Sequence, residues 1–544
     1  MNVKSKIKDT FFVLHCTHDD FYKMGDSQIC KFYDGQNVLV TGGTGFMGKI
    51  LIEKLLRSTD VATIFLLIRE KKGKNVHTRL DDIFDNIIFE RLKKERPKFR
   101  HRVVAVAGDC SISGLGLTIT DRQKLMSEVH IAFHVAATVR FDENLKLSYS
   151  INVKGTADVI ELCRQMKNLK SLIHVSTAYS NCHLDSIDET FYDYPVDYEK
   201  VGALLEKVSK SEADKLTPRV IGKWPNTYTF TKALAEALIR NTATSLPVGI
   251  FRPAIVISTY KEPMESWIDN LYGPTGAVAG AASGLLRVFP CNEDVVADIV
   301  PVDTCVAGII AAAWDVTNKR NERTSPSIPI YNYVSSVSNS VTWNEYITLN
   351  KIHGTKYPLL KALWTIKIAA ISDPRLYLLM RIFLHLIPAF FLDFCAIIVG
   401  QKPRLVSMYS KIHKFSDVIA FFCTREWKFT NDNVENLWEK MNTADKELFP
   451  LSITTVPWIT YFRGYFKGIR VHLLNDPMST LDEARARKRK FDFAHNGLKF
   501  LFVFIIVTLF WIVVFKTAAL FSSDTEAVTF SNSTDNFLTD VLNS

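Results

Sequence analysis

A glycine-rich turn near the N-terminus, set between a short apolar run and an amphipathic one, constrains the fold more than any other feature. Residues 36–40 read QNVLV, an apolar run rich in β-forming residues, and TGGTGFMGKILIEKLLRS follows directly. In the later part of that segment, apolar residues recur at helical spacing, at Ile50, Leu51, Leu55 and Leu56. The order is therefore strand, glycine turn and helix.

The glycines of this turn have the spacing of a dinucleotide-binding loop. Gly42, Gly45 and Gly48 are three residues apart, and Gly43-x-Gly45-x-x-Gly48 also fits the fingerprint. Glycine is needed because the turn is tight, the backbone approaches a pyrophosphate closely, and the helix packs against its strand. The phosphates then meet exposed N–H groups at the positive end of a helix. This context predicts an α/β fold with a Rossmann-type doubly wound parallel sheet.

The end of the next strand-like run bears on which dinucleotide binds. ATIFLLIRE ends near Arg69, where an NAD-specific fold would carry a carboxylate for the ribose 2′-hydroxyl. A guanidinium suits a 2′-phosphate, so we expect NADPH; the alternative is that Arg69 is a solvated strand end. Two further runs end at Asp109 and Ala136, and small residues at a strand end let a cofactor lie against the backbone.

A tyrosine and a lysine four residues apart supply a candidate proton donor. Tyr228 and Lys232, in YTFTK, would share one helix face. The lysine ammonium is expected to lower the pKa of the phenol from about 10 and to hold the nicotinamide ribose. YxxxK is common by chance, but this pair follows the run SLIHVSTAY and precedes another strand-like run. The end of SLIHVSTAY offers Ser176 and Thr177 as hydroxyl partners for a substrate oxygen.

A long apolar run near the C-terminus predicts a single membrane anchor. Residues 500–515 are apolar except for one Thr, and a helix that continues to Phe521 spans a bilayer if Lys516 snorkels. RARKRK precedes the run, whereas the segment after Lys516 is acidic and carries the glycosylation triplet that begins at Asn532. The positive-inside bias therefore places everything before the anchor in the cytosol. Endoplasmic reticulum and peroxisome membranes both fit this topology.

Charge and cysteine content exclude other classes of protein. A formal net charge of +9 over 544 residues is too small an excess to indicate nucleic acid. Nine cysteines without a CxxC pair indicate a reduced protein that faces the cytosol. His15, Cys16 and His18 lack the spacing of zinc ligands, so no metal site is expected.

Several segments, taken in order, resemble one known family. They are TGGTGFMG, HVAATVRFDE, INVKGT, HVSTAYSN, YTFTKALAE and FRPAIVIS. This series is similar to the extended short-chain dehydrogenases/reductases. Three further segments resemble one group within this family, the eukaryotic fatty acyl-CoA reductases: DIVPVD, LYGPTG and YFRGYFKGIRVHLLNDP. The resemblance extends from about Phe32 to Pro477.

The resemblance implies reduction of a long-chain fatty acyl-CoA to a primary alcohol with two NADPH, through a bound aldehyde. It implies Tyr228 as general acid and Lys232 as the group that orients the cofactor. Thr177 would supply the hydroxyl, and Ser176 stays open. The residues expected to bind the cofactor are Thr41, Gly42, Thr44, Gly45, Phe46, Met47, Gly48, Arg69, Asp109, Ala136, Tyr228, Lys232 and Pro253.

A second apolar stretch, residues 376–400, is interrupted by Arg381, His385, Pro388 and Asp393. Charges are expensive in lipid. We therefore expect a broken helical hairpin that packs in protein or dips into the membrane surface, rather than a spanning helix. Its apolar surface is a candidate site for the acyl tail.

Two other functions fit parts of the sequence. A sterol or sugar-nucleotide dehydrogenase or epimerase would share the glycine loop and YxxxK, and the C-terminal region discriminates against it. A non-catalytic NADPH-binding membrane scaffold is the other class, and intact Tyr228 and Lys232 argue against it. The expected partners are long-chain fatty acyl-CoA and membrane lipid; a homo-oligomer stays open, and nucleic acid is not expected.

The expected organisation has six parts. They are an N-terminal arm (1–31), an NADPH-binding Rossmann-type reductase domain with substrate loops (32–350), a mostly helical C-terminal domain (351–477), a basic juxtamembrane segment (478–496), a transmembrane anchor (497–521) and an acidic tail (522–544).

Overall fold

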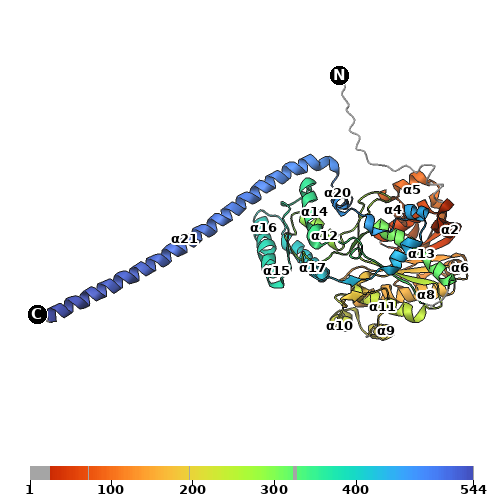
Figure 1. Ribbon diagram of the computed structural model, residues 1–544, viewed down its shortest axis with the longest axis horizontal. Helices are drawn as coiled ribbons and strands as arrows, with labels where there is room; N and C mark the ends of the chain where they lie inside the picture. The colour runs from red at the N-terminus through yellow and green to blue at the C-terminus, as the bar shows by residue number, and fades with distance from the viewer. Residues whose placement is uncertain (1–24, 72, 195, 323–326, 543–544) are drawn as a thin grey trace, which may run out of the picture.

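The computed structural model describes residues 25–542, apart from Lys72, Pro195 and residues 323–326, with side chains described to residue 519. His15, Cys16 and His18 lie outside the described residues, as do residues 1–24 of the N-terminal arm. Figure 1 shows a globular part and a long C-terminal helix that extends away from it.

A seven-stranded parallel sheet forms the centre of the described part, in the order β11-β7-β5-β4-β1-β2-β3. The chain moves outward in one direction from β1 and in the other from β4, so the two strands flank the switch point where such folds bind ligands. The Rossmann-type prediction is confirmed. The strands are β1 (Asn37–Thr41), β2 (Thr63–Ile68), β3 (Val103–Ala107), β4 (Ile131–His134), β5 (Ser171–Val175), β7 (Val248–Pro253) and β11 (Ile330–Tyr333).

Alternating side chains of the sheet face two hydrophobic cores. Val38 and Val40 of β1 pack with α3 (Phe46–Ser58) and α13 (Val302–Asn321), whereas Leu39 packs with α8 (Gly155–Arg164) and α11 (Thr227–Thr242). Strands covered on both faces need continuous apolar runs such as NVLVT and TIFLLI. The helices that precede α12 are α2 (Gln28–Tyr33), α3 (Phe46–Ser58), α4 (Val76–Phe84), α5 (Glu90–Glu95), α6 (Ile119–Glu128), α7 (Leu145–Tyr149), α8 (Gly155–Arg164), α9 (Tyr198–Lys207), α10 (Lys210–Ile221) and α11 (Thr227–Thr242).

The second half of the chain is mostly helical, as predicted, and its short strands pair with one another or with the first half. The pairs are β8 (Ile255–Ile257) with β10 (Ile299–Pro301), β9 (Val288–Pro290) with β12 (Ala369–Ile371), and β6 (Ser186–Ile187) with β13 (Lys428–Phe429). The helices are α12 (Pro274–Ala282), α13 (Val302–Asn321), α14 (Trp343–Lys356), α15 (Pro374–Arg381), α16 (Ile387–Ile398), α17 (Leu405–Cys423), α18 (Asp432–Lys440), α19 (Thr443–Leu448), α20 (Trp458–Gly468) and α21 (Leu481–Leu542).

The stretch 376–400 is not broken into a hairpin, so that expectation is wrong. α15 continues through one π turn, η6 (Ile382–Leu386), directly into α16. The π turn lies just before Pro388, which has no N–H for a regular helical bond and sits in the first turn of α16. The hairpin instead pairs this helix with α17, which packs against α16.

Two helices in the described part are long and apolar enough to cross a membrane. They are Pro374–Ile398, whose apolar part is mostly outside the protein core, and Met478–Ala519, whose apolar part has no buried residue. In Figure 1, α15, α16 and α17 lie on the side of the globular part from which α21 extends.

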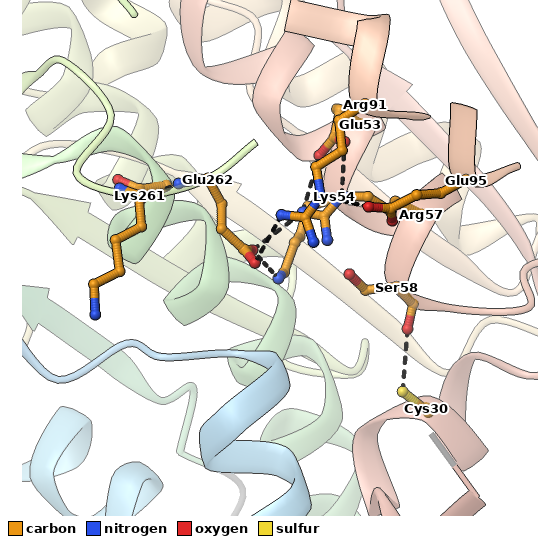
Figure 2. Close-up of polar contacts among 10 residues, drawn as sticks. Cys30, Glu53, Lys54, Arg57, Ser58, Arg91, Glu95, Lys261 and Glu262 are labelled. Carbon is orange, nitrogen blue, oxygen red and sulfur yellow. Dashed lines mark hydrogen bonds and ion pairs between the residues drawn. The ribbon is translucent and has the colours of Figure 1, made fainter. Parts of the chain in front are cut away.

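A cluster of charged side chains fastens the loop after β8 to the helices after β1. Glu262 accepts hydrogen bonds from Lys54 and Arg57 of α3 and from Arg91 of α5 (Figure 2). Burial alone would raise the pKa of Glu262, but the three cations hold it well below its ordinary value. Lys261 points away from this cluster. The loop is therefore held over α3, the helix that follows the glycine turn.

Candidate active site

The glycine turn has the close backbone contacts that its sequence predicts. Gly42 has φ +76°, and a Cβ there would lie 2.6 Å from the Ala136 nitrogen. A Cβ on Gly48 would lie 2.3 Å from the Gly42 oxygen. Side chains at either position would push α3 away from the turn or the turn away from β4. The geometry fits a loop shaped to bring backbone N–H groups against a ligand.

The first turn of α3 is open to a ligand. Gly45 is its N-cap and supplies no side-chain cap, so helix N–H groups keep their donor capacity. Thr44, Phe46 and Met47 are half-buried and Gly45 is exposed. The ring of Phe46 stacks on Trp267 at 5.4 Å between centroids. These features fit a pyrophosphate at the positive end of a helix.

Thr41 and Ala136 hold the turn in place from beneath. The Thr41 side chain is buried, with Oγ1 2.7 Å from Nδ1 of His134. Thr41 Oγ1 also accepts a hydrogen bond from the Ala136 N–H at 3.3 Å. Burial lowers the pKa of His134 to about 3, so this link is neutral. Thr41 therefore ties β1 to β4 and lies below the ligand-facing surface of the loop.

Two guanidinium groups lie together beyond the end of β2. Arg69 is half exposed, and its Nη1 is 3.8 Å from a carboxylate oxygen of Asp109. Arg79 of α4 donates to the Arg69 carbonyl oxygen, and its pKa is lowered by partial burial and by the Arg69 charge. A dianionic group placed between them would relieve this repulsion. Sequence reasoning identified Arg69 and missed Arg79, which has no motif of its own.

The predicted proton donor lies with a hydroxyl and an aromatic ring. Tyr228 is in the first turn of α11, and its phenol ring stacks on Phe141 at 5.7 Å between centroids. Burial raises the pKa of Tyr228 to about 12, and a hydrogen bond with the Thr177 side chain opposes this rise. Thr177 lies two residues beyond the end of β5 and caps the short helical turn that follows. The structure thus brings Tyr228 and Thr177 together.

Lys232 lies on the same helix but does not act on the phenol as expected. Its amine is buried and donates to the Val175 carbonyl oxygen at 2.7 Å. The expectation that Lys232 lowers the Tyr228 pKa is wrong for this structure, because burial dominates that pKa and the amine is directed at the end of β5. Burial lowers the pKa of Lys232 to about 8, and Glu236 opposes this shift.

Ser176 belongs to a buried ion-pair network rather than to the Tyr228 site. Its hydroxyl donates to Glu236 at 2.5 Å, and both side chains are buried. Glu236 also accepts two hydrogen bonds from Arg252, at 2.7 and 3.0 Å, with both partners fully buried. Pro253 follows Arg252 at the end of β7, two strands from β4, and is buried.

Asn152, in the segment INVKGT, is a buried polar residue to which the sequence pattern assigns no role. It lies in the π turn η4 (Ser150–Lys154), between α7 and α8. Its amide accepts from the Thr138 N–H at 3.0 Å and donates to Thr231 Oγ1 at 3.0 Å. The residue therefore links the loop after β4 to the helix that carries Tyr228. The signal available in the sequence was a single amide between Ile151 and Val153.

Among the residues that the structure describes, no group of three or more His, Cys, Asp or Glu side chains could hold a metal ion. A dinucleotide turn at the switch point and a Tyr–Lys helix at a neighbouring strand end define a nicotinamide-dependent oxidoreductase of the Rossmann type.

Comparison with known sequences narrows this class. Two family models, both described as male sterility protein, match residues 40–309 and 384–476, and the first is an NAD-binding model. Fatty acyl-CoA reductase wat of Drosophila melanogaster is 43% identical over 470 residues, which cover 86% of this chain and 90% of the relative. Fatty acyl-CoA reductase 1 of Homo sapiens is 36% identical over 488 residues, 89% of this chain and 92% of the relative. The chain belongs to the fatty acyl-CoA reductase family, whose members are alcohol-forming oxidoreductases.

Solved structures agree on the fold. The terminal R domain from the myxalamid PKS-NRPS biosynthetic pathway has a TM-score of 0.52 at 18% identity and covers 83% of this chain and 97% of that one. The reductase (R) domain of a nonribosomal peptide synthetase from Mycobacterium tuberculosis has a TM-score of 0.51 at 19% identity, covering 83% and 96%. At this identity the likeness concerns the fold alone.

Proposed function

We propose that the protein reduces long-chain fatty acyl-CoA to a primary alcohol, with NADPH as reductant and release of CoA. The observation that carries the proposal is the grouping of Tyr228, Thr177 and Lys232 at the end of β5, on the same sheet edge as the glycine turn. Parallel strands place their carboxyl ends at one edge, so a carbonyl held at Tyr228 faces the dinucleotide crevice.

The chain's own residues fit NADPH. The glycine turn and the uncapped start of α3 would hold the pyrophosphate, and Arg69 with Arg79 would hold a 2′-phosphate. When bound, NADPH supplies one hydride in each of two reductions. The first reduction breaks the C–S bond, so that CoA leaves as the thiol and an aldehyde remains. The second converts the aldehyde to the alcohol.

Tyr228 acts as the acid in both reductions. Its phenol donates a proton to the carbonyl oxygen as negative charge develops there, and Thr177 donates a second hydrogen bond that holds this oxygen. Lys232, held on the Val175 carbonyl at the end of β5, would hold the nicotinamide ribose when the cofactor is bound. No protein nucleophile is required, because CoA is already a leaving group.

Product analysis tests the proposed function directly. The full-length protein in detergent is incubated in three separate reactions: with NADPH and hexadecanoyl-CoA, with NADP⁺ and a 3-hydroxysterol, and with NAD⁺ and a UDP-sugar. We expect fatty alcohol and free CoA thiol from the first reaction and no turnover of the other two. Turnover of the sterol or the UDP-sugar alone would contradict the proposal in favour of another short-chain dehydrogenase. No turnover with intact NADPH binding would favour a scaffold.

The proposed preference for NADPH rests on Arg69. Replacing Arg69 with Gln removes a charge-assisted contact with the 2′-phosphate, so we expect the KM for NADPH to rise roughly 10- to 100-fold, with little change for NADH. Initial rates at varied cofactor concentration measure this effect. Arg100→Gln is the matched control, because Arg100 is similarly exposed and pairs with Asp81 away from the glycine turn. Equal loss with both cofactors would contradict the assignment.

The apolar helix of α15 and α16 fits contact with a membrane surface. Phe390, Phe391 and Phe394 are each more than half exposed, whereas His385 and Asp393 on the opposite face are buried. Asp393 accepts three backbone N–H groups from the start of α17, at 2.9 to 3.0 Å. The polar groups that argued against lipid therefore face the protein. We propose that the outer face rests in the cytosolic leaflet beside the α21 anchor.

The proposed topology has a single crossing by α21, with residues 25–477 in the cytosol, in an endoplasmic reticulum or peroxisome membrane. The basic residues before the apolar run favour this orientation. An epitope tag added after Ser544 is expected to survive protease applied to intact vesicles, while the catalytic part is digested. Detergent should expose the tag as a control. Digestion of the tag in intact vesicles would contradict the topology.

A further inference from the structure

The start of α21 docks on the globular part through one face of the helix. Asp492, His495 and Lys499 follow one another at helical spacing, so they share this face. Asp492 accepts a hydrogen bond from the Thr365 hydroxyl, and Trp364 Nε1 donates to His495 Nδ1 at 3.4 Å. The docked face therefore meets the segment before β12 just ahead of the apolar run of α21.

Two basic side chains of the globular part lie beside this face. Arg287 directly precedes β9, and its carbonyl oxygen accepts a hydrogen bond from the Ala369 N–H of β12 at 3.0 Å. Lys367 lies two residues before Ala369, so the parallel pairing puts both cations at the same end of two neighbouring strands. Partial burial lowers the pKa of His495, and the charges of these two side chains and of Lys499 lower it further. The three cations thus converge on one ring.

The Arg287 guanidinium is half-buried and lacks a counter-charge of its own. In the part of the chain that the structure describes, it forms no ion pair and no hydrogen bond, and neither do the amines of Lys367 and Lys499. Burial lowers the pKa of Arg287. The carboxylate of Asp492 is already paired with Lys488. A desolvated guanidinium among other cations is unfavourable, and a bound anion would relieve both effects.

The position of these cations fits the surface of a membrane. Lys499 directly precedes the apolar run of α21. The Trp364 ring packs against Phe491 at 5.6 Å between centroids, and Trp is typical of the membrane–water interface. The Arg287 N–H donates to His385, in the π turn between α15 and α16, at 3.0 Å. The cations therefore lie between the anchor and the apolar helix that we place in the leaflet.

We propose that Arg287, Lys367 and Lys499 bind the phosphate of an anionic phospholipid in the cytosolic leaflet. This phosphate site rests on the proposed anchoring by α21 and goes beyond the proposed catalysis. A guanidinium offers two parallel donors to phosphate oxygens, and the two ammonium groups add charge. The same cations repel the choline of a zwitterionic headgroup, so the site prefers anionic lipid. A lipid held there fastens the globular part to the membrane beside its anchor.

The phosphate site is separate from the exposed basic run RARKRK that precedes the anchor. Lys490 of that run is exposed. At roughly 100° per residue it lies half a turn away from Lys499, on the other side of α21. General attraction between a basic segment and an anionic surface would involve Lys490 as much as the phosphate site. Lys490 therefore supplies a matched control.

Lipid titration tests the phosphate site. Full-length protein in an uncharged detergent at fixed ionic strength is titrated with dioctanoylphosphatidylglycerol, and the rise of the thermal unfolding midpoint gives the Kd. Arg287→Gln removes a charge-assisted, two-donor contact, so we expect the Kd to rise roughly tenfold or more. Lys490→Gln removes the same charge outside the site and should change the Kd little.

Two other ligands identify the source of the phosphate. Dioctanoylphosphatidylcholine and inorganic phosphate should each bind roughly tenfold or more weakly than the anionic lipid, because the first carries a cation and the second has no acyl chains. Inorganic phosphate that binds as tightly as the lipid would overturn a lipid site. Equal binding of the two lipids would overturn the assignment to the cations.

The variants decide the remaining outcomes. If Arg287→Gln does not fold, the exposed Lys499 carries the same test, and Lys499→Gln should raise the Kd roughly fivefold. An unchanged Kd in either folded variant overturns the site. A rise in Lys490→Gln equal to that in the site variant also overturns it, in favour of general attraction. The titration needs no turnover, so failure of the proposed catalysis would appear in product analysis and not here.

Discussion

Replacing Tyr228 with Phe is expected to abolish alcohol formation while leaving NADPH binding intact. The substitution removes only the phenol oxygen, so the stack on Phe141 and the start of α11 are retained. Loss of a positioned general acid costs roughly 10²- to 10⁴-fold in rate, and Thr177 lacks the acidity to replace it. Rates of CoA release and alcohol formation, together with NADPH titration by fluorescence, measure the two effects separately.

The control for this experiment is Tyr272→Phe. Tyr272 is 56% exposed in the segment before α12, so loss of its hydroxyl should leave both the rate and NADPH binding unchanged. Full turnover by the Tyr228→Phe variant would show that another group protonates the substrate. Loss of NADPH binding in that variant would instead make Tyr228 part of the cofactor site.

Replacing Glu236 with Gln is expected to destabilise the fold strongly. Glu236 and Arg252 are both fully buried, and Glu236 also accepts a hydrogen bond from Ser176. The neutral amide leaves the guanidinium without a counter-charge, which costs about 3–5 kcal/mol in the free energy of unfolding. For a domain of this size the thermal midpoint should fall by on the order of 10 °C.

A matched substitution at the surface separates this effect from loss of a carboxylate in general. Glu161 pairs with Arg164 on α8, and both side chains are nearly half exposed. Exposed pairs contribute about 0–1 kcal/mol, so Glu161→Gln should change the midpoint little. Thermal unfolding of both variants, followed by circular dichroism, makes the comparison. Equal midpoints would contradict the assigned role of the buried pair.

The sheet and its ligand edge could be predicted because their signals are local. The pattern of strand, glycine turn and helix lies within residues 36–58, and the close approach of Gly42 to β4 follows from it. The pair Tyr228 and Lys232 was found by helical spacing. Helical spacing does not predict which hydrogen-bond acceptor a long side chain reaches. In the structure the Lys232 amine donates to the Val175 carbonyl oxygen.

Other features depend on contacts between distant segments and could not be predicted. An apolar pocket is lined by residues as far apart in the sequence as Pro274 and Phe466, which only the packing of the helices brings together. In the sequence of residues 376–400, His385 and Asp393 look like polar interruptions of an apolar stretch, and Ala389 gives no signal of its own. They recur every four residues and form the buried face of one continuous helix. That periodicity was present in the sequence.

Isotope transfer tests the central claim most directly. NADPH that carries deuterium at both C4 positions of the nicotinamide is incubated with the full-length protein and hexadecanoyl-CoA, and the products are analysed by mass spectrometry. Two successive hydride transfers to one carbon predict hexadecanol with two deuterium atoms at C1, formed together with free CoA. Unlabelled alcohol, or consumption of NADPH without release of CoA, would contradict the account.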